Sequence, residues 1–202
     1  MKENLILIFT RNPELGKVKT RLAATIGDFN ALEIYKILLN HTVKIVGEIQ
    51  VSKRVLYSEI IIHNDIWDPN IYQKKKQLGN DLGEKMRNAF AEGFIDGYKK
   101  IIIIGTDLFD LEVSDIENAF EKLENYDVVI GPADDGGYYL LGLKSIPKGV
   151  FLNKNWGSNR ILKDTLKDIE ELNVFLLKSK NDIDIYDDII KISEFQKYTN
   201  LK

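Results

Sequence analysis

The fold is decided by the stretch IIIIGTD, which occupies residues 101–107. Four consecutive isoleucines form the most β-like run in the chain, and a run without polar residues is typical of a strand that is covered on both faces. A second apolar run, residues 4–9, is bounded by polar residues and predicts another buried strand. Buried strands of this kind indicate a parallel sheet between layers of helices.

Strands and helices alternate along the rest of the chain. Further strands are predicted at residues 55–57, 71–77, 128–130, 138–143 and 174–177. Three helices are predicted to start at the capping pairs Asn30/Glu33, Asp81/Glu84 and Ser114/Glu117. Two more are predicted over residues 158–172 and 185–195. This alternation implies right-handed crossovers, so the sequence predicts an α/β protein, a three-layer α/β/α fold with a mostly parallel central sheet. Because no linker or repeat interrupts it, we expect a single domain over residues 1–202.

The composition excludes several classes of function. A chain of 202 residues with 44% hydrophobic and 29% charged side chains can bury a core and is not disordered. A net charge of -3 argues against nucleic acid or an anionic membrane as a partner. Because the chain has no cysteine and two histidines, a catalytic metal would be a hard ion such as Mg²⁺ or Mn²⁺ held by carboxylates.

The same sequence gives no sign of a membrane span. Its longest apolar runs are far shorter than the roughly 20 residues that cross a bilayer. The first residues carry charges but no apolar stretch of signal-peptide length. We therefore expect a cytoplasmic protein.

The loop after the strand at residues 4–9 is strongly basic. It runs from Thr10 to Arg21 and carries cations at Arg11, Lys17, Lys19 and Arg21. Cations and free backbone N–H groups at the start of a helix suit a phosphate, although a solvated basic turn would have the same composition. The loop matches neither the GxGxxG nor the GxxxxGK[ST] pattern of other nucleotide-binding proteins.

Acidic residues follow three other predicted strands. Asp107 stands where a carboxylate could hold a divalent ion against phosphate. It could instead serve only a turn or a helix cap, although Ser114 is the better cap for the next helix. Two glycines after Asp134 and Asp135 permit close backbone approach to a ligand, but a plain hairpin turn would also use them. The acidic run at residues 182–188 follows the last predicted strand and suits the dipole of a helix N-terminus.

Five segments together resemble a known family. They are FTRNPELGKVKTRLA, QLGNDLGEKM, GTDLFDL, GPADDGGYYLLGL and DIDIYDDI, and in this order they resemble the DUF2064 family of GT-A-fold, nucleotide-diphospho-sugar-transferase-like glycosyltransferases. The resemblance covers residues 6–189. The KTRLA segment at residues 19–23 is also similar to the 2-phospholactate guanylyltransferases, which are nucleotidyltransferases of the same fold.

The resemblance implies roles for individual residues. It assigns nucleotide binding to Arg11, Gly16, Lys17, Lys19, Arg21, Gln77, Gly79, Asp81 and Gly83. It implies Mg²⁺ or Mn²⁺ at Asp107 and Asp184, with Asp182 as the alternative second ligand. It places the sugar or acceptor at Asp134, Gly136 and Gly137, beside Asp135, whose carboxylate has the chemistry of a general base for an acceptor hydroxyl.

These assignments predict a metal-dependent glycosyltransferase that uses a nucleotide sugar and a small-molecule acceptor. The alternative is a nucleotidyltransferase that uses an NTP and releases pyrophosphate. Phe109 stands where the family usually has proline, so a nucleotide-binding module without turnover is a second alternative. His41, within a predicted helix, and His63, within a polar loop, are expected to be structural or exposed.

Overall fold

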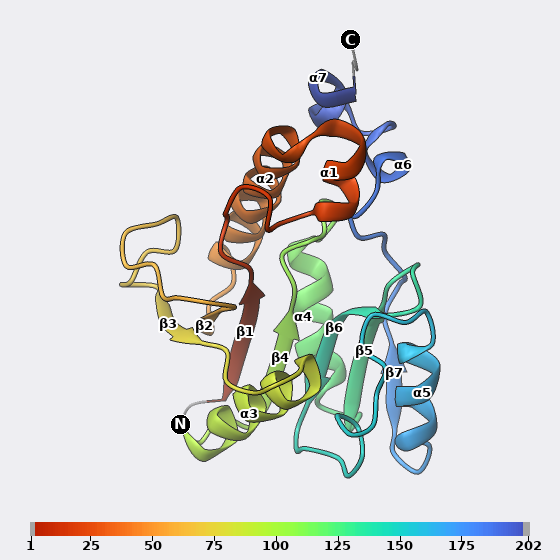
Figure 1. Cartoon of the computed structure of the whole chain (residues 1–202). Coiled ribbons are helices and arrows are strands. Elements are labelled where there is room, and N and C mark those ends of the chain that lie inside the picture. The colour runs from red at the N-terminus through yellow and green to blue at the C-terminus, as the bar shows by residue number, and fades with distance from the viewer. Residues whose placement is uncertain (1–2, 200–202) are drawn as a thin grey trace.

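A seven-stranded sheet forms the centre of the protein in a computed structural model, which describes residues 3–199. The strands are β1 Asn4–Thr10, β2 Ser52–Tyr57, β3 Tyr72–Lys76, β4 Lys100–Ile104, β5 Val128–Pro132, β6 Tyr138–Leu143 and β7 Val174–Leu176. Their order across the sheet is β3-β2-β1-β4-β6-β5-β7 (Figure 1). β6 is antiparallel to both neighbours, and the other pairs are parallel. The predicted mostly parallel sheet is therefore confirmed.

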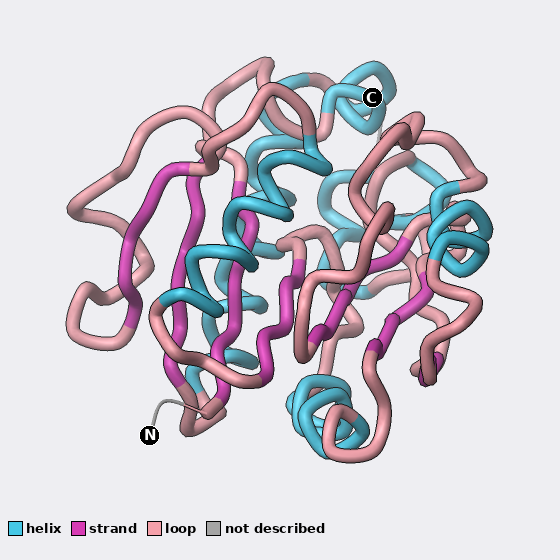
Figure 2. Tube along the Cα trace, turned by 90° about the horizontal axis from the view of Figure 1, so that it is seen from below, coloured by secondary structure: helices cyan, strands magenta, loops and turns pink. Residues whose placement is uncertain are grey.

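Helices cover both faces of this sheet. They are α1 Thr20–Ile26, α2 Asp28–Gly47, α3 Leu82–Ile95, α4 Val113–Lys122, α5 Ile161–Asp168, α6 Tyr186–Ile189 and α7 Gln196–Thr199, with a 3-10 turn at Ser193–Phe195. α2 and α4 pack on one face, whereas α3 and α5 pack on the other. Figure 2 shows the strands as one twisted row across the molecule. The predicted three-layer α/β/α architecture is confirmed. None of the helices within residues 3–199 is long and apolar enough to cross a membrane.

The apolar runs form the core because successive side chains of a strand point to opposite faces. In β1, Ile6 and Ile8 pack toward α2 and α4, whereas Leu5 and Leu7 pack toward α3. The isoleucines of β4 divide in the same way. A strand buried on both faces needs apolar residues at every position, which explains the uninterrupted runs.

A third cluster fixes the last part of the chain beside α1. Leu22 and Ile34, from α1 and α2, pack there with Ile183 and Phe195. Phe109 packs against the same cluster, with its ring 4.9 Å from that of Phe195. Phe109 therefore anchors the loop after β4 to the C-terminal segment. The predicted domain, residues 1–202, extends at both ends beyond the described residues.

Two predicted helix starts are wrong. α2 begins at Asp28 directly after Gly27, so Asn30 lies inside the helix and donates to the Ile26 carbonyl at 2.9 Å. α4 begins at Val113, because Asp115 accepts a hydrogen bond from the Glu112 N–H at 2.8 Å and so closes the first turn. Ser114, the predicted cap, therefore lies inside α4.

Two other predicted helices are shorter than expected. The helix predicted over residues 158–172 is present as α5, Ile161–Asp168. The helix predicted over residues 185–195 is broken into α6 and the 3-10 turn. The capping prediction for α3 is confirmed, since Asp81 accepts from the Glu84 N–H at 2.8 Å.

Candidate functional site

The loops that were expected to carry chemistry meet at one edge of the sheet. β1, β2 and β4 end there, and the antiparallel β6 begins there (Figure 1). A cavity of about 490 Å³ lies at this edge. Six predicted site residues line it, namely Arg11, Gln77, Asp107, Asp135, Gly137 and Asp182.

The remaining predicted residues lie outside the lining of this cavity. They are Gly16, Lys17, Lys19, Arg21, Gly79, Asp81, Gly83, Asp134, Gly136 and Asp184. Several of them hold the lining residues in place, as the following contacts show.

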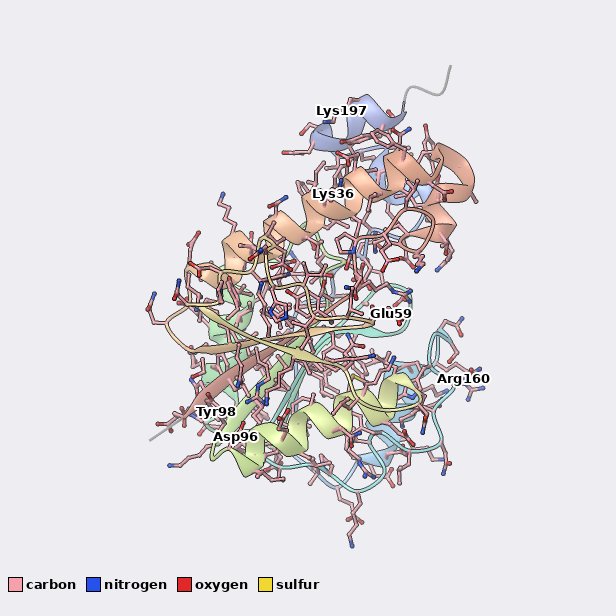
Figure 3. The ribbon with its side chains drawn as sticks, turned by 60° about the vertical axis from the view of Figure 1, so that its left-hand side comes forward. Lys36, Glu59, Asp96, Tyr98, Arg160 and Lys197 are labelled. Carbon is pink, nitrogen blue, oxygen red and sulfur yellow. The ribbon has the colours of Figure 1, made fainter. Side chains whose placement is uncertain are left out.

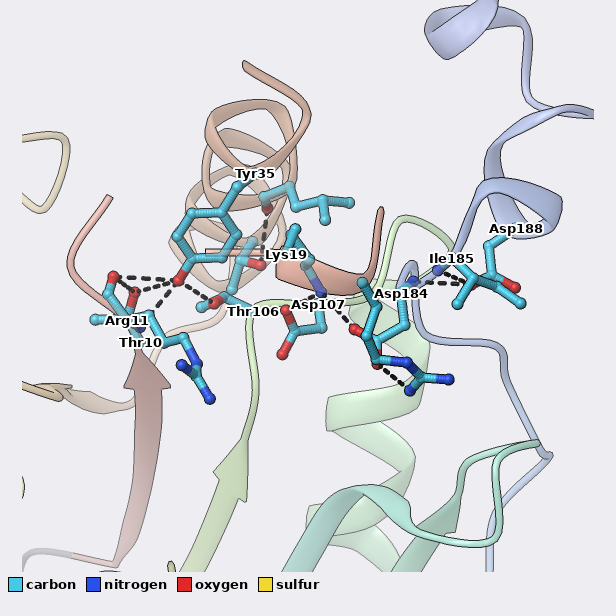
Figure 4. A network of polar contacts seen from close by, with 12 residues as sticks. Thr10, Arg11, Lys19, Tyr35, Thr106, Asp107, Asp184, Ile185 and Asp188 are labelled. Carbon is cyan, nitrogen blue, oxygen red and sulfur yellow. Dashed lines mark hydrogen bonds and ion pairs between the residues drawn. The ribbon is translucent and has the colours of Figure 1, made fainter. Parts of the chain in front are cut away.

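Tyr35 of α2 connects the loop after β1 to the loop after β4 (Figure 4). Its hydroxyl accepts a hydrogen bond from the Arg11 N–H at 2.9 Å and donates to the Arg11 carbonyl at 3.1 Å. The same hydroxyl lies 3.2 Å from the hydroxyls of Thr10 and Thr106. Burial raises the pKa of Tyr35, with the nearby Asp107 carboxylate acting in the same direction. Tyr35 was not among the predicted site residues, so sequence reasoning missed this role.

Lys19 is buried at the start of α1 and is in contact with two carboxylates. Its ammonium contacts Asp107 and lies 3.3 Å from Asp184 Oδ1 (Figure 4). Its side chain is only 4% exposed. Burial alone would lower the pKa of this ammonium, but Asp107 and Asp184 outweigh burial and raise it. Lys19 therefore stays charged.

The backbone at Lys19 is left-handed, with φ of 48°. L residues other than glycine rarely adopt this conformation, because the Cβ atom crowds the backbone. Strain of this kind persists only where the surrounding structure enforces it, and it concentrates at functional sites. The strained backbone therefore marks Lys19 as a residue whose position the fold enforces.

Asp184 binds two cations from the basic loop. Its Oδ1 atom faces Lys19, and its Oδ2 atom lies 3.0 Å from the Arg21 guanidinium. Asp188 accepts hydrogen bonds from the N–H groups of Asp184 and Ile185, both at 2.8 Å (Figure 4). Both carboxylate oxygens of Asp184 are thus engaged, and the acidic run serves partly as an anchor for the basic loop.

Asp107 and Asp182 are the two predicted metal-ligand candidates that line the cavity. Burial, and then the nearby Asp107 carboxylate, raise the pKa of Asp182 to about 7. Within residues 3–199, no three Asp, Glu, His or Cys side chains gather closely enough to hold a metal by themselves. Mg²⁺ commonly takes only one or two carboxylates and completes its shell with substrate phosphates and water. The hard oxygen donors of Asp107 and Asp182, both on the cavity wall, fit such an ion.

The rest of the basic loop is fixed by a buried amide. The side chain of Asn12 accepts from the Glu59 N–H at 3.0 Å and donates to the Ile60 carbonyl at 2.9 Å.

Arg11 is exposed and lines the cavity. Lys17 is also exposed, but it lies outside the cavity lining and pairs with Glu14 at 2.6 Å. Of these two cations, only Arg11 is placed to meet a ligand in the cavity.

The segment from Gln77 to Gly83 has mainly structural contacts. The Gln77 amide donates to the Leu56 carbonyl at 2.9 Å and so ties the end of β2 to this segment. Gly79 has φ of 144°, and a Cβ atom there would lie 2.8 Å from the Lys85 nitrogen. Gly83 faces the indole of Trp156, at 2.7 Å from an added Cβ atom. A side chain at either glycine would therefore displace its neighbours.

The turn between β5 and β6 approaches another part of the chain closely. A Cβ atom at Gly136, where φ is 90°, would lie 2.1 Å from the Asn159 carbonyl oxygen. The Gly136 carbonyl accepts from the Leu162 N–H at 2.9 Å. Asp135 accepts from the Gly137 N–H at 2.8 Å, and its carboxylate lies on the cavity wall. Asp134 contacts Ser179 instead. In the structure, the close backbone approach at Gly136 is therefore to the segment before α5.

Sequence reasoning missed the residues that this segment contributes. Trp156, Ser158 and Ile161 line the cavity beside Tyr138 of β6. No motif distinguishes residues 156–161, and only the unusual residue type of Trp156 could have indicated them. The two histidines lie outside the cavity lining, and His41 contacts the Leu111 carbonyl at 2.9 Å.

Comparisons with known proteins give the family and the fold of this chain. The family described as "Uncharacterized protein conserved in bacteria (DUF2064)" matches residues 42–158. A structure from Desulfovibrio desulfuricans G20, assigned as a nucleotide-diphospho-sugar transferase, is 31% identical with a TM-score of 0.85, and the match covers 98% of this chain and 91% of that one. No curated protein matches the chain.

More distant structures share the fold alone. A cytidylyltransferase from Leptospira borgpetersenii is 14% identical with a TM-score of 0.58, over 93% of this chain and 84% of that one. The inositol-1-phosphate CTP transferase from T. maritima is also 14% identical, with a TM-score of 0.51 over 98% and 96% of the two chains.

Proposed function

Because this chain belongs to the DUF2064 family, and because a basic loop and paired carboxylates meet at its cavity, we propose that it is a transferase using a nucleotide-activated donor. In its specific form, the proposal is a glycosyltransferase that moves a sugar from an NDP-sugar to a small-molecule acceptor in the cytoplasm. The observation that carries it is the convergence of Arg11, Asp107 and Asp182 on one cavity at the carboxyl ends of the strands, where α/β proteins bind nucleotides.

The nucleotide is proposed to lie along the wall formed by β1, β2 and α3. Arg11 and Lys85 are the cations that line the cavity within the described residues, and both are on this wall. Lys19 and Arg21 add positive charge just beyond Asp107 and Asp184. Charge-assisted contacts from Arg11 and Lys85 would stabilise the phosphates, and Lys19 and Arg21 would add to the positive potential.

A Mg²⁺ or Mn²⁺ ion is proposed at Asp107 and Asp182, with Asp184 positioning Lys19 and Arg21 rather than binding the ion. When bound, such an ion supplies positive charge that neutralises the departing phosphate. Lys19 is held beside this site by its contact with Asp107. Its positive charge would therefore add to the electrostatic stabilisation of the departing phosphate.

Asp135 is proposed as the general base. Its hydrogen bond from the Gly137 N–H fixes the carboxylate on the cavity wall. In this position it would accept the proton of an acceptor hydroxyl as that oxygen attacks.

A nucleotidyltransferase is the second candidate. The fold shared with the two cytidyl-transferring proteins favours it. The two reactions differ in the bond that breaks, since sugar transfer releases NDP whereas nucleotidyl transfer releases pyrophosphate.

A thermal-shift screen followed by product analysis separates the candidates. NTPs and NDP-sugars are tested with and without Mg²⁺ or Mn²⁺, and we expect the folded state to be stabilised most by a nucleotide together with a divalent ion. Release of NDP supports sugar transfer, and release of pyrophosphate supports the second candidate. Binding without release of either product would indicate a nucleotide-binding module without turnover.

A further inference from the structure

Positive charge is unevenly distributed around the cavity. The wall formed by β1, β2 and α3 carries Arg11 and Lys85. A second wall is formed by the β5–β6 turn, β6 and the segment before α5; it meets α3 where Trp156 packs against Gly83, and none of its described lining residues is a lysine or arginine. It carries the carboxylate of Asp135, and Asp182 lies on the adjoining surface. This half of the cavity is therefore acidic.

Aromatic and aliphatic side chains form most of this second wall. We refer to Tyr138, Trp156 and Ile161 as the aromatic wall. Trp156 is partly exposed, and its indole packs against Gly83 in the first turn of α3, which holds the ring in one place. The hydroxyl of Tyr138 is buried, so this side chain does not offer its polar end to the cavity. The wall thus presents apolar ring surface, with Ser158 beside it.

The cations that lie near this wall in the sequence are exposed or already paired. Arg160 precedes α5 but is exposed at the periphery of the molecule (Figure 3). Lys154 is paired with Asp168, and Lys163 is exposed. The lining residues of the aromatic wall itself supply no cation to a phosphate placed on it, and Asp135 would repel that phosphate.

We infer that the aromatic wall receives an uncharged, ring-bearing hydroxyl compound, and that the acceptor of the transferase is this compound rather than a phosphorylated one. The inference rests on the proposed function and gives the acceptor its chemical class. The apolar face of the ring packs on Trp156, and one hydroxyl faces Asp135. The hydroxyl oxygen forms a bond to the sugar C1 atom, the bond from C1 to the phosphate oxygen breaks, the NDP leaves with the electron pair, and Asp135 takes the proton.

The two tryptophans of the chain allow a direct test. Trp67 is 1% exposed, packs on Tyr72 and does not line the cavity. The variant Trp67→Phe therefore leaves Trp156 as the single tryptophan and its fluorescence as a report on the aromatic wall. This variant is titrated with phenyl β-glucoside and with its 6-phosphate, with a saturating nucleoside diphosphate and Mg²⁺ present.

We expect a saturable change of Trp156 emission with the neutral glucoside, and at least a tenfold weaker response to the 6-phosphate. Equal or tighter binding of the 6-phosphate would overturn the inference, as would the absence of any response to both compounds. If Trp67→Phe does not fold, the same titrations are followed by calorimetry on the wild-type protein and on Trp156→Ala. Loss of glucoside binding in Trp156→Ala, with partial recovery in Trp156→Phe, is then expected, and unchanged binding in Trp156→Ala would overturn the inference.

The nucleotide provides the control that separates the two proposals. Metal-dependent stabilisation by the nucleoside diphosphate, measured on the wild-type protein, tests the proposed function. If the nucleotide binds and the glucoside does not, the inference about the acceptor fails alone. If the nucleotide also fails to bind, the proposed function fails with it.

Discussion

Replacing Lys19 by alanine and by glycine separates its charge from its strained backbone. Both changes remove the ammonium that contacts Asp107 and Asp184. Only glycine also relieves the left-handed backbone, where φ is 48°. The two variants should therefore bind nucleotide equally weakly but differ in stability.

The magnitudes follow from exposure and backbone geometry. Removing one partner of a buried ion pair costs about 3–5 kcal/mol. Asp107 and Asp184 are 45% and 43% exposed, so water compensates much of that loss, and Lys19→Ala should cost about 1–3 kcal/mol. Glycine avoids the strain of the left-handed conformation, so Lys19→Gly should be about 1 kcal/mol more stable than Lys19→Ala.

Urea unfolding and calorimetric titration with a nucleoside diphosphate measure the two effects. The affinity for the nucleoside diphosphate should fall by the equivalent of about 1–3 kcal/mol in both variants, because both remove the ammonium beside Asp107. Equal stability of the two variants would refute the account of backbone strain. Nucleotide affinity at the wild-type level in either variant would show that Lys19 only supports the loop.

Four further changes test other parts of the site. Tyr35→Phe removes the hydroxyl between the two loops and should lower the free energy of unfolding in urea by about 1–3 kcal/mol; an unchanged value would show that the hydroxyl does not contribute. Gly136→Ala places a Cβ atom 2.1 Å from the Asn159 carbonyl oxygen and should lower the melting temperature, whereas an unaltered temperature would contradict that close approach. Asp107→Asn should abolish the metal-dependent part of the thermal shift with nucleotide, and a retained metal response would move the ligand elsewhere. Asp135→Asn should leave nucleotide affinity unchanged but slow transfer by about 10²-fold, and wild-type turnover would exclude a role as base.

The sheet could be predicted from the sequence because the runs at β1 and β4 have one physical explanation, burial on both faces. Helix starts were less predictable, because several neighbouring residues can compete to cap one helix. Asp115 closes the first turn of α4 from inside, and Gly27 sets the start of α2 through its backbone. Such competition is decided by a few hydrogen bonds that the spacing of residues does not reveal.

That the acidic and basic loops meet at one edge of the sheet could be predicted because they follow strand ends directly. Which of their residues line the cavity could not, since it depends on which carboxylate oxygens the cations reach. Asp184 is engaged by Lys19 and Arg21, whereas Asp182 lies on the cavity wall. Trp156 was missed because only the packing of its segment against Gly83 brings it to the cavity.

The most direct test of the central claim is the position of a bound metal. Crystals are grown with Mn²⁺ and a nucleoside diphosphate, and anomalous scattering locates the ion. The account predicts one Mn²⁺ ion that contacts Asp107, Asp182 and the phosphates, with the nucleoside along the wall of β1, β2 and α3. A metal bound by Asp184 without Asp182, or a nucleotide bound away from Asp107, would contradict it.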